Sequence, residues 1–397
     1  GIPYNLKTQK YLRRITKIAK ASTYSTVGNR EDLTSVISTL EPESTPFISM
    51  MKKAKAMARG NPLKMALLNH DKGMSHQVFS SLPFQGNWLN NEEFRVVAQL
   101  KYAAPQSCLR TLLGQPIARS KERVDRYGFK LACENKIPGN ERLIRHSVME
   151  LLIAKDAVDA NLYMEVEPAN LFSTVVNANI NEEMRADLTG GNGWEEKRNM
   201  RSIIPDFVHQ MPDSENSGVM VDVLSDVKYM CPGGAMYRHQ GNGKKAVETK
   251  DKATGNAYLV NSQKADKKYN QEELLQIEEG GWGPIEKKVR GYGKIRSLVF
   301  GAYGEVSQDV EVMMKWIAEN MAEKVWILNG QDSPMAAKSR AMQVIRARWA
   351  AEAARGQARL ILGRRQYVGP SPGKRINVAI QDTLMAQMEN NVYRQYG

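Results

Sequence analysis

Two consecutive stretches near the C-terminal end carry the strongest helical pattern of the chain and restrict its fold most. Over residues 307–328 apolar side chains recur every three or four positions for about six turns, and Asn329-Gly330 ends the pattern. Ser333 and Pro334 then supply an N-cap and a first helical residue. Because the connection is short, we expect two antiparallel helices packed by their apolar stripes, the second weakening near Gly356.

The second of these helices is rich in arginine. Since arginine binds phosphate through two parallel hydrogen bonds, an arginine face opposite the apolar stripe predicts a contact with nucleic acid. The residues assigned to this outer face are Arg340, Arg346, Arg348, Arg355 and Arg359.

The net charge of +13 is concentrated in two segments. Residues 1–20 hold six cations and no acid, and residues 334–376 hold ten cations against Glu352 alone, so the remainder is close to neutral. Two basic segments on a nearly neutral body favour contact with a polyanion, although a solvated charged face is the alternative. The N-terminal residues predicted to face nucleic acid are Lys7, Lys10, Arg13, Arg14 and Lys17.

The first basic segment also has helical periodicity over residues 5–20. A basic amphipathic helix suits a membrane surface, a nucleic acid or the acidic face of a partner, and the sequence leaves these alternatives open.

Residues 21–56 predict a helix, a proline hinge, a second short apolar turn and a basic exit. Glu41-Pro42 stops the helix because the residue before proline is pushed out of the α region. We call this segment the strap, because its apolar stripe is expected to dock on another surface. The stripe residues are Leu33, Val36, Ile37, Leu40, Phe47 and Ile48.

Three groups of residues in the strap resemble the N-terminal segment of the major capsid proteins of tailed bacteriophages. They are Gly28-Asn29-Arg30-Glu31-Asp32-Leu33, then Leu40-Glu41-Pro42 with Thr45-Pro46-Phe47, then Lys53-Ala54-Lys55-Ala56. The resemblance covers about 36 of 397 residues. That family continues into an extended loop poor in glycine, whereas here residues 57–68 are basic and contain Gly60-Asn61-Pro62. The alternative is an ordinary amphipathic helix with a proline stop.

The resemblance implies an α+β, tailed-phage capsid (HK97-like) fold with an N-terminal arm, an extended loop, and peripheral and axial domains. It also implies that the strap docks on a neighbouring subunit. The corresponding parts are an N-terminal arm (1–56), an extended loop (57–105), a peripheral-domain helix region (106–188), a β-rich axial or insertion region (189–306), and a helical pair with a basic C-terminal segment (307–397).

Several local patterns add expected elements to these parts. Residues 93–102 predict a strand, residues 141–166 a helix, and the valines from Val219 to Val227 further strands. Residues 231–256 are rich in glycine, lysine and polar side chains, which predicts a long exposed loop.

Cysteine usage and hydropathy exclude further classes of protein. Cys108, Cys133 and Cys231 are far apart, which predicts no disulfide framework and favours a reducing compartment. No apolar run approaches the length of a membrane span, and the N-terminus lacks an apolar signal core, so we expect neither a span nor secretion by that route.

The sequence contains no complete catalytic or metal-binding motif. Gly369-Pro370-Ser371-Pro372-Gly373 matches a nucleophile elbow in letters, but Pro372 lacks the amide that the elbow needs. Gly241-Asn242-Gly243-Lys244-Lys245 lacks the first glycine and the final Ser or Thr of a phosphate loop. The histidines show no metal-binding helical spacing. We therefore predict no enzyme, no cofactor and no metal.

The leading hypothesis is a structural subunit that self-assembles into an icosahedral capsid shell enclosing DNA. Its partners would be other copies of itself, packaged nucleic acid held by non-specific phosphate contacts, and other virion proteins, without a membrane. It would reside in the virion after assembly in the host cytoplasm. The alternative is a basic nucleic-acid-binding protein of a ribonucleoprotein or mobile-element complex. An enzyme whose residues come together only in the fold is third.

Overall fold

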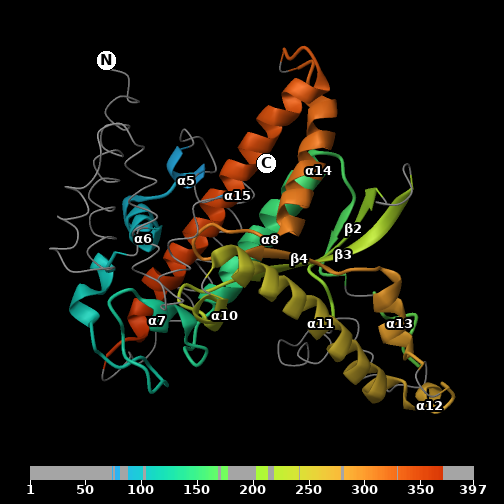
Figure 1. Ribbon diagram of the computed structural model, residues 1–397, viewed down its shortest axis with the longest axis horizontal. Helices are drawn as coiled ribbons and strands as arrows, with labels where there is room; N and C mark the ends of the chain where they lie inside the picture. Colours follow the sequence, from blue (N-terminus) through green and yellow to red (C-terminus); the bar gives the residue numbers. More distant parts are fainter. Residues whose placement is uncertain are drawn as a thin grey trace, which may run out of the picture.

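The computed structural model describes residues 74, 77–80, 88–101, 104–168, 171–177, 203–212, 219–240, 242–278, 281–328 and 330–369. The strap and the N-terminal basic segment lie outside the described residues. The described chain is a mixed α+β structure (Figure 1).

The described elements follow one another along the chain as a run of helices, a set of strands, a second run of helices and a final helical pair. They are α5 (Gln77–Ser80), α6 (Asn91–Lys101), η2 (Ser107–Leu112), α7 (Phe129–Cys133), α8 (Glu141–Asp159), β1 (Met164–Val166), β2 (Phe207–Pro212), β3 (Met220–Tyr229), α10 (Ala235–Gln240), α11 (Gly243–Tyr269), α12 (Gln271–Leu274), α13 (Pro284–Gly291), β4 (Arg296–Phe300), α14 (Gln308–Val325), α15 (Pro334–Arg364) and η4 (Arg365–Tyr367).

The four strands form one sheet in the order β1-β2-β3-β4. Strand β2 is antiparallel to both β1 and β3, with Phe207 opposite Ser225, whereas β4 runs parallel to β3, with Ser225 opposite Arg296. A parallel pair needs a long crossover connection, and here α10, α11 and α13 provide it.

Helices cover both faces of this sheet. Side chains alternate along β3, so Val223 and Val227 face the core shared with α8, α14 and α15, while Leu224 faces the core shared with α11 and α13. Figure 1 shows α11 and α13 in yellow on one side and the orange-red pair of α14 and α15 on the other. The sheet is therefore the middle layer, which explains why β3 is largely apolar.

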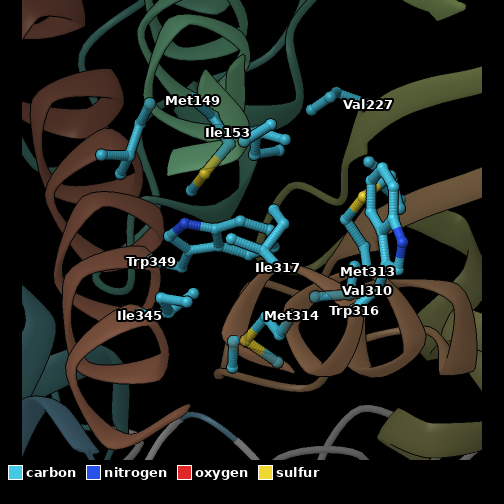
Figure 2. Close-up of a cluster of buried hydrophobic side chains, with 14 of the residues drawn as sticks. Met149, Ile153, Val227, Val310, Met313, Met314, Trp316, Ile317, Ile345 and Trp349 are labelled. Carbon is cyan, nitrogen blue, oxygen red and sulfur yellow. The ribbon is translucent and has the colours of Figure 1, made fainter. Parts of the chain in front are cut away.

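The predicted antiparallel pair is confirmed as α14 and α15, and α14 packs beside the first part of the longer α15 (Figure 1). Trp349 is fully buried among Ile317, Ile345 and Met149 in the core that Figure 2 shows. Its indole Nε1 donates a hydrogen bond to Asp156 Oδ2 at 2.8 Å, which satisfies the polar edge of the ring.

Helix α15 does not weaken at Gly356 as predicted but continues to Arg364. A Cβ at position 356 would lie 2.4 Å from Cγ of Arg145 on α8. This glycine therefore permits close approach of two helices and does not mark a break.

Two sequence predictions of local structure are wrong. The strand expected over residues 93–102 is helix α6, where Asn90 and Glu93 cap each other: Glu93 N donates to Asn90 Oδ1 at 2.9 Å, and Asn90 N donates to Glu93 Oε2 at 3.0 Å. The loop expected over residues 231–256 is largely α10 and α11, and Asn242 caps α11 by accepting from Lys245 N.

These corrections change the expected parts of the chain. The described segments of the predicted extended loop are the helices α5 and α6, and the predicted β-rich region contains α10, α11, α12 and α13 beside its strands. The helix predicted over residues 141–166 is confirmed as α8, although it ends at Asp159 and the last residues of that range form β1. The strand predicted around Val219–Val227 is confirmed as β3.

Candidate nucleic-acid interface

Four of the five arginines predicted to face nucleic acid on α15 are paired with carboxylates. Arg348 Nη2 lies 2.6 Å from Asp156 Oδ1, and its side chain is only 13% exposed. Arg359 Nε donates to Glu93 Oε1 at 2.7 Å. Two further arginines are paired with carboxylates: Arg346 with Glu311, and Arg355 with Glu352.

The physical reason is the position of α15 in the fold. It is a central helix that packs against α6, α8 and α14, and each of these helices turns a carboxylate toward it. Arg346, Arg348, Arg355 and Arg359 are thus each paired with a carboxylate, whereas Arg340 and the paired Arg359 are exposed.

The other predicted site residues lie outside the described residues. They are the N-terminal cations Lys7, Lys10, Arg13, Arg14 and Lys17, and the strap residues Leu33, Val36, Ile37, Leu40, Phe47 and Ile48.

Exposed cations gather instead on α11. This helix holds seven lysines against Glu248, Asp251 and Asp266, and its buried side packs on the sheet through residues such as Tyr258 and Ala265. Six of the lysines are exposed, and we call them the α11 lysine surface. They are Lys244, Lys245, Lys252, Lys264, Lys267 and Lys268.

The seventh lysine of α11, Lys250, is half-buried and lies beside the end of β3. Burial lowers the pKa of Lys250, and the charge of Lys228 on β3 lowers it further, against the opposing effect of Asp226. Within the described ranges no ion pair joins the Lys250 ammonium to a carboxylate. Its charge is therefore opposed only at longer range, chiefly by Asp226.

Lys228 Nζ contacts Asp226 Oδ2 at 2.5 Å, and the two side chains are 33% and 2% exposed. Burial raises the pKa of Asp226 to about 6, Asp206 raises it too, and Lys228 opposes both. The hydroxyl of Tyr258 on α11 donates to the carbonyl oxygen of Ile204 at 3.3 Å. Asp226 thus holds one of the two lysines from within β3.

Asp206, immediately before β2, links Asp226 and Lys228 to α8. Its Oδ2 accepts from Val227 N at 2.5 Å and lies 3.0 Å from His146 Nε2. Burial favours the protonated form of Asp206, but the hydrogen bond and charge of His146 outweigh it and lower the pKa. In turn, burial opposes protonation of His146, and the hydrogen bond to Asp206 outweighs it and raises the pKa.

Glu150, one turn after His146 on α8, completes the group. Its Oε2 lies 3.7 Å from His146 Nδ1, and its buried Oε1 has no hydrogen-bond partner among the described residues. Burial raises the pKa of Glu150 to about 8, with a further contribution from Asp206. Glu150 is therefore mainly neutral near pH 7.

We call these residues the Lys228 cluster: Lys228, Lys250, His146, Asp206, Asp226 and Glu150. With Glu150 neutral, Lys228, Lys250 and His146, whose pKa is raised, face the carboxylates of Asp206 and Asp226. The cluster carries a positive excess when His146 is protonated, and His146 and Lys228 reach solvent. Such a group can hold an anion and change its charge close to neutral pH.

Sequence reasoning missed the Lys228 cluster because its members come from four separate segments. One local signal existed. Asp226 and Lys228 lie two residues apart, hence on one face of a strand whose second half is buried, where charges need partners. His146 and Glu150, four residues apart on α8, give a weaker signal of the same kind.

Comparisons with protein-family profiles, curated proteins and solved structures found no match to this chain. Across the described ranges, no group of three His, Cys, Asp or Glu side chains is arranged to hold a metal ion. No described helix is both long and apolar enough to cross a membrane.

Proposed function

We propose that this chain binds nucleic acid through phosphate contacts on the α11 lysine surface and the Lys228 cluster. The observation that carries the proposal is Lys250, a half-buried ammonium crowded by a second lysine and joined to no described carboxylate. Because burial and a neighbouring cation both disfavour its charged form, a bound phosphate would stabilise it.

The proposed contact is independent of base sequence. Lysine carries a compact charge on a flexible stem. Such a charge suits phosphate oxygens but does not form the paired hydrogen bonds by which a planar side chain recognises a base edge. Affinity should therefore fall steeply as salt rises, since each phosphate contact releases condensed counterions.

The test is fluorescence anisotropy with a labelled DNA duplex over a series of salt concentrations. Lys250→Gln is expected to weaken binding and to reduce the slope of log affinity against log salt by about 1. The matched control is Lys315→Gln, which removes an exposed lysine on α14, far from α11 in the sequence. Equal loss in both variants, or unchanged binding by Lys250→Gln, would overturn the proposal.

A capsid shell subunit is our second proposal, and it is compatible with nucleic-acid contact. In addition to the strap resemblance, it is supported by an apolar tip where α14 meets α15. Ile327, Leu328 and Met335 are 71%, 84% and 71% exposed at this tip, which projects from the body in Figure 1. Clustered exposed apolar side chains are typical of contact surfaces between proteins.

On this second proposal, other copies of the chain cover the tip and receive the strap, and the chain adopts the capsid fold with swapped arms. Many weak contacts then add up, because each subunit meets several neighbours. The assembled shell would enclose DNA in a virion formed in the host cytoplasm.

Light scattering coupled to size-exclusion chromatography, with negative-stain electron microscopy, tests self-assembly. Leu328→Asp and the strap variants Leu33→Asp and Ile37→Asp should block assembly while the monomer stays folded. Leu275→Asp, which changes an 87% exposed leucine after α12, is the control and should assemble normally. A protein that stays monomeric under all conditions would refute the shell proposal and leave nucleic-acid binding standing.

A further inference from the structure

Two cysteines that are far apart in the sequence meet in the fold. Cys133 is the last residue of α7, and Cys231 follows β3. The Cys133 thiol donates to the carbonyl oxygen of Pro232, the residue after Cys231, at 3.3 Å. Both side chains are half-buried, so small solutes can reach them.

The backbone holds the Cys231 loop against α7. Gly233 has φ of 76°, and a Cβ there would lie 2.5 Å from Cβ of Phe129, so only glycine permits this approach. The amide of Gly233 also donates to the Tyr303 hydroxyl at 3.2 Å. The approach of the Cys231 loop to Cys133 at the end of α7 is therefore built into the packing.

Arg145 of α8 faces Cys231 from the other side. Its Nη2 lies 3.9 Å from Cys231 Sγ, its Nη1 donates to Gln357 Oε1 at 2.8 Å, and its guanidinium lies over the Tyr229 ring. The neighbouring Cys133 thiol and the charge of Arg145 lower the pKa of the Cys231 thiol, against the effect of burial. The Arg145 guanidinium beside Cys231 Sγ therefore favours the thiolate form of Cys231.

We propose that Cys133 and Cys231 form a reversible disulfide when the protein meets hydrogen peroxide. The Cys231 thiolate attacks one peroxide oxygen, the O–O bond breaks, and hydroxide leaves with a sulfenic acid on Cys231. The Cys133 sulfur then attacks the Cys231 sulfur and the S–O bond breaks. The departing hydroxide takes the proton of Cys133 and leaves as water.

Mass spectrometry of the full chain treated with peroxide tests the proposal without any mutation. The intact protein should lose two hydrogen atoms, and a tryptic digest should contain one peptide pair linked through Cys133 and Cys231. Dithiothreitol should restore the starting mass. Peroxide-treated protein with no linked pair, or with Cys108 in the linkage, would overturn the proposal.

Variants separate the two roles. Cys133→Ser should leave a sulfenic acid on Cys231 that dimedone traps, whereas Cys231→Ser should give no adduct at Cys133. Cys108→Ser is the control, since burial raises the pKa of this third thiol, and its variant should form the disulfide at the wild-type rate. Equal dimedone labelling of Cys133 and Cys231 in the two single variants would contradict the assignment of Cys231 as the attacking thiolate.

Discussion

Glu150→Gln is the change that most directly probes the electrostatics of the Lys228 cluster. In the native state burial raises the pKa of Glu150 from 4.5 to about 8, and Asp206, Glu167 and Asp226 raise it too, against His146. Between these two values the native protein holds a proton that the unfolded chain has released. Stability must therefore fall as pH rises through this window.

The size of the effect follows from linkage. Each pH unit in the window lowers the free energy of unfolding by about 1.4 kcal/mol, so this carboxyl costs about 3 kcal/mol near pH 7. Glutamine keeps the shape and has no proton to lose. We expect Glu150→Gln to match the wild type near pH 4.5 and to exceed it by about 3 kcal/mol near pH 7.

Urea denaturation followed by circular dichroism over a pH series measures this difference. Glu323→Gln, an exposed glutamate on α14, is the matched control and should track the wild type at every pH. If Glu150→Gln is less stable than the wild type near pH 7, Glu150 is ionised and paired with His146, and the charge count of the Lys228 cluster is wrong.

Two further predictions concern α15 and its neighbours. Arg348→Met should destabilise the fold by about 3–5 kcal/mol in urea denaturation, because it leaves Asp156 buried without its ion pair. Arg340→Met is the control and should change the stability by no more than about 0.5 kcal/mol. Equal effects of the two variants would contradict the pairing of Arg348 with Asp156. Gly356→Ala should cost roughly 1–3 kcal/mol, because its methyl group meets Arg145. Gly255→Ala, inside α11 with open space around it, is the control and should stabilise the protein by about 0.5–1 kcal/mol. A Gly356→Ala variant that is more stable than the wild type would refute the close packing of α8 on α15.

Local signals were enough to predict some elements. Ser333 and Pro334 begin α15 as expected, with Ser333 Oγ accepting from Ala336 N at 3.3 Å, and the apolar stripe of α14 is buried in the core of Figure 2. Strand β3 was predictable for the same reason, since its valines alternate. In each case the residues that decide the structure are neighbours in the sequence.

Features that depend on distant partners could not be predicted. The arginines of α15 appeared free because nothing in the sequence says that Asp156 and Glu93 lie opposite them. Helix α11 was missed because lysines and small polar residues blur its periodicity, although its buried side holds Tyr258 and Tyr269. The Lys228 cluster exists only because the sheet brings Asp206 beside Asp226.

The charge state of Lys250 tests the central claim most directly. Side-chain NMR of Lys250, followed through a pH titration with and without a DNA duplex, reports its pKa in both states. We predict a Lys250 pKa below its usual value in the free protein and a rise when the duplex binds. A Lys250 pKa that is normal in the free protein, or that the duplex leaves unaltered, would contradict the proposed phosphate site.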